Sequence, residues 1–195
     1  MSRVFFTSDH HFGHARVIQY ASRTWASTVD EMNENLIDKW NSTVSPGDTV
    51  YHLGDFALIR PDKAAWIASR LNGTKHILWG NHDTNLRDNK GFLAQFASSA
   101  DLKTIRVPDP SASGGSQIIA LCHYAMKVWD RSHYGTWSLF GHSHGSMPDD
   151  PHSLSMDVGV DCHDGYPVPY EVVRERMGRK KWKPVDDHGG RSNDA

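Results

Sequence analysis

Short apolar runs alternate with polar, glycine-bearing motifs along this chain of 195 residues. Short apolar runs that end at turn-forming residues are typical of buried strands. We predict a strand at each of the runs, which are residues 4–6, 49–53, 76–79, 118–122 and 137–140. A polar motif follows most of these runs directly. Because the ends of neighbouring strands can meet at one edge of a sheet, the motifs can converge on one site.

Apolar side chains at helical spacing predict helices between these strands. Residues 28–43 place Leu36 and Trp40 on one face, and either Thr28 or Asp30 can cap that helix. Proline in the first turn and tryptophan, isoleucine and leucine on one face predict a second helix over residues 61–71. Two further segments are a weaker helix or loop and a short helix, residues 84–97 and 170–177.

The order of these elements indicates the fold class. Strand and helix alternate in the first half, which predicts a parallel core. The second half runs from strand to strand, with strands over 101–107 and 156–161 and a hairpin loop over 108–116, which predicts antiparallel additions. A mixed sheet or a two-sheet sandwich flanked by helices, an α/β (α+β) fold, satisfies both halves. We expect a single domain over residues 1–177 and a polar C-terminal tail over 178–195.

Composition and charge narrow the class of protein. The formal net charge of -2 gives no overall attraction to nucleic acid. Two cysteines are too few for a disulfide framework and fit a reducing compartment. We see neither a signal peptide nor an apolar run long enough to span a membrane, so we expect a cytoplasmic protein without a membrane partner. The 13 histidines are many for this length.

The polar motifs contain ligands suited to transition metals. Asp9 and His11 are two residues apart, so on an extended strand end both can reach one ion, and His142 and His144 repeat this spacing. A carboxylate such as Asp55 can bridge two cations, whereas imidazole cannot. A set of carboxylates, imidazoles and one amide suits Mn, Fe, Zn or Co better than Ca or Mg.

These motifs together resemble the signature of the calcineurin-like metallophosphoesterases, in particular small bacterial and phage members. The matching words are Asp9-x-His11, Gly54-Asp55, Gly80-Asn81-His82-Asp83, His123 and Gly141-His142-x-His144. The resemblance implies a two-sheet sandwich with helices outside and a site for two metal ions. It implies that one ion binds Asp9, His11, Asp55 and His144. It implies that the other binds Asp55, Asn81, His123 and His142, with Asp55 as the bridge.

The resemblance also implies roles in catalysis. His82 matches the catalytic histidine, which stabilises charge at phosphorus or protonates the leaving oxygen. Asp83 is expected to orient His82 through its second ring nitrogen. Many members carry aspartate and arginine where this chain has Leu58 and Ile59, with Arg60 one residue later. The residues that we consider for substrate contact are His14, Arg60 and Trp129.

The leading hypothesis is a phosphoesterase that uses two divalent or trivalent transition-metal ions, Mn, Fe or Zn, as its cofactors. Phosphodiesters are preferred as substrates because no cationic clamp for a dianionic phosphate is evident. A nucleotide or a nucleic-acid end is a candidate substrate. Three alternatives stay open: a phosphomonoesterase on the same site, a metal-binding interaction module, and a nucleic-acid-processing protein that uses the basic run over 179–183. The sequence does not fix the oligomeric state.

Overall fold

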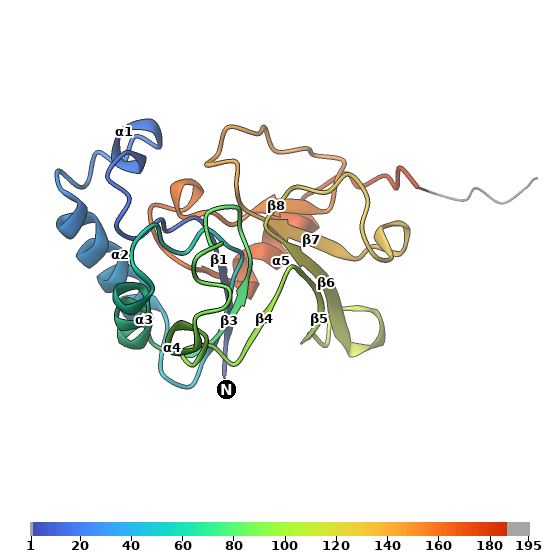
Figure 1. Ribbon diagram of the computed structural model, residues 1–195. Coiled ribbons are helices and arrows are strands. Elements are labelled where there is room, and N and C mark those ends of the chain that lie inside the picture. Colours follow the sequence, from blue (N-terminus) through green and yellow to red (C-terminus); the bar gives the residue numbers. More distant parts are fainter. Residues whose placement is uncertain (1, 187–195) are drawn as a thin grey trace, which may run out of the picture.

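The computed structural model describes residues 2–186, which form two packed β-sheets with helices outside (Figure 1). The first sheet has the strand order β4 (Ser98–Ala100), β3 (Thr74–Leu78), β2 (Thr49–His52), β1 (Val4–Thr7) and β9 (Val168–Pro169). The second has the order β5 (Leu102–Pro108), β6 (Ser116–Cys122), β7 (Trp137–Phe140) and β8 (Ser155–Asp157). The helices are α1 (Val17–Tyr20), α2 (Val29–Thr43), α3 (Pro61–Arg70), α4 (Lys90–Leu93) and α5 (Tyr170–Gly178). The two-sheet fold expected from the sequence is confirmed.

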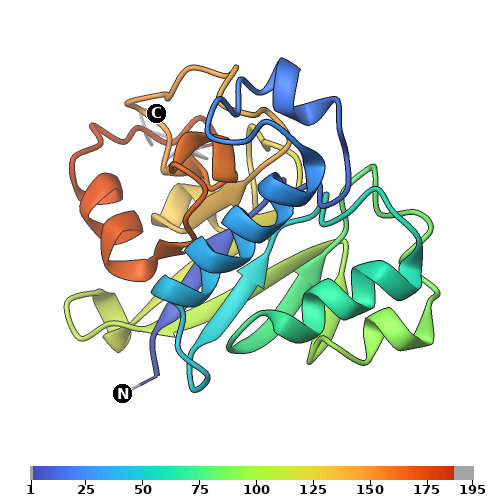
Figure 2. The ribbon, with the colours of Figure 1, turned by 90° about the vertical axis from the view of Figure 1, so that its left-hand side faces the viewer.

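Alternating side chains of the first sheet divide the core into two layers. Phe5 faces the helices and packs with Leu36 and Trp40 of α2, whereas its neighbour Phe6 faces the second sheet and packs with Leu121 and Leu139. Successive residues of a strand point to opposite faces, so an uninterrupted apolar run serves both layers. Figure 2 shows α2 lying across the outer face of the first sheet, with α3 beside it.

The predicted helices 28–43 and 61–71 are confirmed as α2 and α3. The Thr28 hydroxyl accepts the backbone N–H of Glu31 at 3.2 Å and caps α2, so Thr28 and not Asp30 is the cap. Of the segment 84–97, only α4 is helical, and the Asn89 side chain caps it by accepting from Phe92 N at 2.9 Å. The sequence pattern did not predict α1, β4 or β9, each of which has four residues or fewer.

The expectation of antiparallel strands throughout the second half is wrong. The β5–β6 pair is antiparallel, and β9 pairs antiparallel with β1, whereas β6–β7 and β7–β8 are parallel. The chain crosses over through residues 123–136 and 141–154, and long connections of this kind allow parallel pairing, which a tight hairpin does not. The predicted strand 156–161 is also shorter, because Asp157 Oδ1 accepts the N–H of Gly159 at 2.7 Å and turns the chain.

Part of the expected tail contacts the domain. The side chain of Lys180 is only 3% exposed and lies 2.7 Å from Asp149 Oδ1, and Trp182 packs against the core between the sheets. These two side chains of the expected polar tail are therefore packed against the domain, and residues 187–195 lie outside the described part of the chain. Among residues 2–186, no helix is both long enough and apolar enough to cross a membrane.

Candidate metal centre

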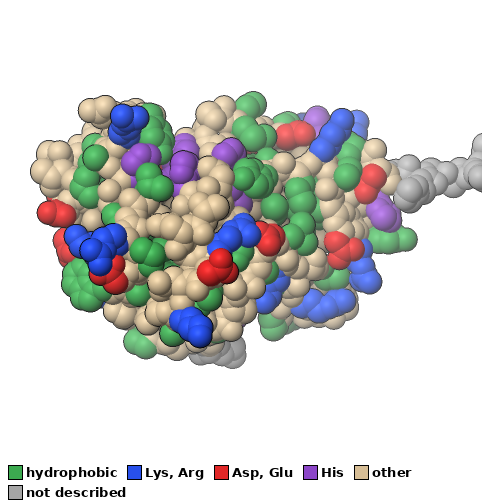
Figure 3. Space-filling view, viewed as in Figure 1, with side chains coloured by type: hydrophobic (Ala, Val, Ile, Leu, Met, Phe, Trp, Pro, Cys, Tyr) green, Lys and Arg blue, Asp and Glu red, His purple; other side chains and the backbone are tan. Residues whose placement is uncertain are grey.

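The polar motifs meet at one edge of the sandwich. Strands β1, β2 and β3 are parallel, as are β6 and β7, so the motifs that follow them emerge at common ends. The contacts that join the sheets there include one between His123 Nδ1 and the carbonyl oxygen of Leu53, at 2.8 Å, and one in which His142 N donates to Asp9 Oδ2 at 2.8 Å. Figure 3 shows histidine side chains gathered on the upper face of the molecule, at this edge.

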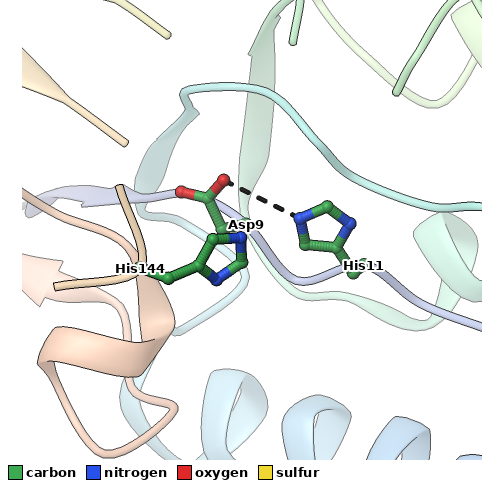
Figure 4. A group of neighbouring side chains, drawn as sticks. All are labelled: Asp9, His11 and His144. Carbon is green, nitrogen blue, oxygen red and sulfur yellow. Dashed lines mark ion pairs between the residues drawn. The ribbon is translucent and has the colours of Figure 1, made fainter. Parts of the chain in front are cut away.

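One group of candidate ligands consists of Asp9, His11 and His144 (Figure 4). One ligand atom from each of these side chains lies within 4.8 Å of the others. Asp9 and His11 are buried, and His11 Nε2 lies 3.9 Å from Asp9 Oδ1. Both side chains therefore point to the same place, which is the convergence that the sequence predicted.

A second group consists of Asp55, His123 and His142, again with ligand atoms within 4.8 Å of one another. Asn81 lies beside it, with Oδ1 3.2 Å from His123 Nε2. His142 and His144 thus join different groups, whereas their spacing of two predicted that both could reach one ion. Their separation agrees with what the family resemblance implied.

Asp55 lies between the two groups. The same oxygen, Oδ2, is 3.5 Å from His11 Nε2 in one group and 3.4 Å from His123 Nε2 in the other. The other oxygen, Oδ1, accepts the backbone N–H of His82 at 2.9 Å. This carboxylate is therefore held with one oxygen facing the backbone and the other facing both groups.

The backbone is strained at most of these residues. Non-glycine residues rarely adopt positive φ, and a cluster of such residues is typical of functional sites. Five of the candidate ligands nevertheless have φ between 48° and 68°: Asp9, His11, Asp55, His142 and His144. The segment 9–11 is therefore not the extended strand end that we expected. Its side chains still alternate, because Asp9 N and His11 N donate at 3.0 Å to the carbonyl oxygens of Gly54 and Asp55.

Unpaired buried atoms indicate what this site could bind. Asp9 Oδ1 and both ring nitrogens of His11 are buried and have no hydrogen-bond partner among the described residues. Leaving such atoms unpaired is costly, so buried polar atoms usually have a partner. Carboxylate oxygen and imidazole nitrogen are ligands for Mn, Fe and Zn. The donor set and its unpaired atoms therefore fit a transition-metal ion.

The protonation states of His11 and Asp55 fit cation binding. Burial lowers the pKa of His11 to about 3, which keeps its ring neutral. Burial opposes the ionisation of Asp55, but the hydrogen bond and charge of His123 outweigh it and bring the pKa of Asp55 to about 2. Neutral imidazole and ionised carboxylate are the forms that bind metal. Burial raises the pKa of Asp9 to about 7, and a bound cation would favour its ionised form. At His123 and His144 burial is outweighed by the hydrogen bonds and charges of nearby carboxylates, which raise the pKa of both rings, so a bound cation would displace their protons.

His82 lies at the edge of the centre, and Asp83 does not take the role predicted for it. The His82 ring is centred 5.2 Å from the ring of His11. Asp83 is fully buried, and its oxygens accept backbone N–H groups of Gly80, Asp55 and Phe56 at 2.8–2.9 Å. The expectation that Asp83 orients the His82 ring is therefore corrected. Its carboxylate instead ties the third motif to the second and fixes the backbone of Asp55.

The three residues considered for substrate contact lie in different surroundings. The ring of His14 is centred 5.6 Å from that of His11, at the edge of the centre. The side chain of Arg60 is 79% exposed and pairs with Asp62 at 3.1 Å. Trp129 Nε1 donates to the Thr136 carbonyl at 2.9 Å.

Trp129 lines a separate pocket. This pocket of about 680 Å³ is also lined by Phe140, Asp161 and Trp182, and by none of the seven candidate ligands. The structure therefore brings only His14 of the three close to the two groups.

Sequence reasoning missed two tyrosines and a buried arginine. Tyr20 is 54% exposed and its ring meets that of His144 edge-on at 5.5 Å, whereas Tyr124 is 46% exposed and its ring lies 4.9 Å from that of His142. Each tyrosine flanks one of the two groups. Tyr124 directly follows a motif histidine, which was an available signal. Nothing in the pattern around Arg23 indicated that it is buried behind the site.

His10, which lies between two candidate ligands, faces away from the centre. It is fully buried, and its Nδ1 lies 3.0 Å from Nε2 of His52 within the core that α2 covers. Its ring stacks on that of Phe12 at 5.1 Å. The histidine pair therefore belongs to the packing beneath the motifs.

No protein-family model matches the chain. The Gene 66 protein of Mycobacterium phage D29 is 30% identical over an alignment of 201 positions. The alignment covers 91% of this chain and 96% of that protein. An uncharacterized protein of Methanocaldococcus jannaschii is 29% identical over 188 residues, covering 93% of this chain and 94% of its own length. The crystal structure of a protein of unknown function from Aquifex aeolicus has a TM-score of 0.65 at 21% identity, and covers 90% of this chain and 99% of that one. This last likeness establishes a shared fold.

Gly80 packs so closely against Asp55 that a larger residue at position 80 should disturb the site. A Cβ at residue 80 would lie 2.1 Å from Asp55 Oδ1 and 2.4 Å from Asp55 N. Backbone cannot move aside cheaply, so Gly80→Ala should displace the shared carboxylate and remove most Mn²⁺ binding, measured by equilibrium dialysis. Gly47→Ala is the control, because a Cβ there has no atom within 4 Å. Equal Mn²⁺ binding by both variants would show that the position of Asp55 does not matter.

Proposed function

The chain belongs to the same family as the Gene 66 protein of Mycobacterium phage D29, and we propose that it is a metal-dependent phosphoesterase. One observation carries this proposal: a single oxygen of Asp55 lies within 3.5 Å of a histidine nitrogen in each of two three-residue donor groups. Two cations close together need such a shared anion, and paired metal sites of this kind are typical of phosphoryl transfer.

The proposed division of ligands uses all seven residues. Asp9, His11, Asp55 and His144 would hold one ion. Asp55, Asn81, His123 and His142 would hold the other. When bound, Mn, Fe or Zn ions would supply Lewis-acid activation of water and of the phosphoryl oxygens.

His82 has a distinct role in the proposal. Its backbone N–H bonds the shared carboxylate, and its partly exposed ring lies beside the rings of His11 and His14, at 5.2 Å and 6.3 Å. From there it would protonate the leaving oxygen or stabilise charge at phosphorus. Asp83 would act through the backbone, by holding Asp55 in place.

Phosphodiesters are the proposed substrates. The side chain of Arg60 points to Asp62, Leu58 is 41% exposed, and exposed tyrosines flank the donor groups. Apolar and aromatic surfaces favour the uncharged second group of a diester over a second negative charge. A nucleotide or nucleic-acid end would satisfy this preference, because its base can stack on tyrosine.

A direct test of the proposed function removes metal with a chelator, restores it with Mn²⁺, and measures hydrolysis of bis(p-nitrophenyl) phosphate. We expect hydrolysis only in the restored protein. A protein that binds two Mn²⁺ ions and hydrolyses neither this diester nor p-nitrophenyl phosphate would favour the metal-binding interaction module instead.

We predict that Asp55→Ala reduces Mn²⁺ binding at both groups and abolishes hydrolysis, because the two cations would repel each other without a shared anion. Inductively coupled plasma analysis of the dialysed protein gives the stoichiometry. Asp62→Ala, which removes an exposed carboxylate paired with Arg60, is the control. Two bound ions and near-normal turnover in Asp55→Ala would reject the bridging role.

We predict that His82→Ala keeps both ions and the fold but lowers kcat by roughly 10²–10⁴, the usual effect of a positioned acid or base. Metal content and circular dichroism establish that the site is assembled, and steady-state kinetics give kcat. Loss of an ion from this variant, with normal kcat once Mn²⁺ is in excess, would instead make His82 a ligand.

We predict that kcat/KM is higher for an aryl diester than for the matched monoester at one pH with one metal. A monoester advantage of tenfold, equal to about 1.4 kcal/mol in transition-state binding, would reject the diesterase assignment. The proposed metal-dependent hydrolysis would survive that result, because it depends on the two donor groups and not on the tyrosines or Leu58.

A further inference from the structure

A fully buried arginine lies directly behind the candidate metal centre. The side chain of Arg23 has no exposed surface, and it follows α1 in the connection to α2. Burying a guanidinium is costly unless its donors are all paired. The burial of this side chain therefore requires that nearby groups pair with it.

Every N–H of the guanidinium has an acceptor. Nε and Nη2 donate to the two oxygens of Asp161, at 2.8 and 3.0 Å. Nη2 also donates to the carbonyl oxygen of Asp9 at 2.6 Å, and Nη1 to that of His10 at 2.7 Å. Nη1 further lies 3.3 Å from the sulfur of Met32. Five donors thus meet five acceptors, and two of these acceptors belong to the backbone of the first motif.

Asp161 connects the arginine to a candidate ligand. Its Oδ2, which accepts from Arg23, also lies 2.7 Å from Nδ1 of His144. A carboxylate at this position takes the N–H at Nδ1 and leaves Nε2 with its lone pair, as it does for metal-bound histidines in general. Arg23 is therefore linked to His144 through the carboxylate of Asp161. It also donates directly to the main chain of Asp9.

Both ends of this network are at strained residues of one donor group. Asp9 has a φ of 61° and His144 a φ of 48°, and both belong to the group with His11. The other group, Asp55, His123 and His142, has no hydrogen bond to Arg23 or Asp161 among the described contacts. The network thus contacts one group directly and is linked to the other only through Asp9, whose Oδ2 accepts the N–H of His142, among the contacts of the described residues.

We propose that Arg23 and Asp161 are positioning residues that pre-arrange Asp9 and His144 for one of the two metal ions. The inference rests on the proposed function. Its consequence is asymmetry: the ion held with Asp9 and His144 depends on this buried pair, whereas the ion held with His123 and His142 does not.

Asp161→Asn tests the inference with little change in shape. Asn keeps one acceptor oxygen, and its NH2 is a donor. With the oxygen in the place of Oδ2, the bond from Arg23 Nε is lost and two donors face each other; with the oxygen in the place of Oδ1, the bonds from Arg23 Nη2 and His144 Nδ1 are lost. We expect the affinity for one of two Mn²⁺ ions to fall by roughly 10–100-fold, the usual effect of losing such an outer partner, while the other affinity stays within about threefold. Calorimetric titration with Mn²⁺ alone measures both. Electron paramagnetic resonance should show a spin-coupled pair in the unmodified protein and an uncoupled ion in the variant at limiting Mn²⁺.

Arg23→Lys is the second variant, because lysine keeps the charge but lacks the planar fork that meets Asp161 and two carbonyls. The same selective loss is expected. The control is Glu34→Gln, which breaks an exposed bidentate pair with Arg70, at 2.7 and 2.5 Å, away from the centre. It should leave both Mn²⁺ affinities unchanged.

The readouts separate positioning from mere stability. A purely structural pair would lower the Tm of the metal-free protein and leave unchanged the rise in Tm that Mn²⁺ causes. That result, or equal loss of both ions, would overturn the inference while the proposed function stood. If the unmodified protein bound no Mn²⁺, the inference and the proposed function would fail together. If one variant does not fold, the other decides the outcome.

Discussion

The arrangement of the site depends on one buried carboxylate that faces two clusters of imidazoles at once. Asp55 can face both clusters only because contacts to its backbone and its side chain hold it in place. Its N–H is held by Asp83, its Oδ1 accepts from His82 N, and Gly80 packs so closely that a Cβ would overlap it. The second and third motifs are therefore a single unit. This close approach explains why glycine precedes the Asn81–His82 pair better than flexibility does.

The backbone strain at the candidate ligands around Asp55 is compensated by hydrogen bonds from neighbouring residues. Five candidate ligands have positive φ, a conformation that costs on the order of 1–3 kcal/mol for each non-glycine residue. The surrounding polar contacts hold these conformations. Asp83 holds the backbone of the second motif, and Arg23 holds the carbonyl of the first. The loss of one of these contacts is therefore expected to move the ligand whose backbone it holds.

The sequence predicted the two-sheet fold and the convergence of the motifs, because both follow from polar residues placed after apolar strands. The separation of His142 from His144 could not come from spacing, since Asp9 and His11 have the same spacing and the same left-handed backbone and yet join one group. The true contacts of Asp83 were hidden, because they are made to the main chain. Arg23 was missed because its partner, Asp161, is 138 residues away along the chain.

Each donor group combines side chains that follow strands of both sheets. Asp9, His11 and Asp55 follow strands of the first sheet, whereas His123, His142 and His144 follow strands of the second. Each group therefore exists only while the sheets are packed face to face through residues such as Phe6 and Leu139. An ion bound by either group would bind the folded state and not the unfolded one, so binding and folding are linked. Loosening the apolar layer between the sheets would separate the ligands before any motif residue changed, which makes that layer part of the site.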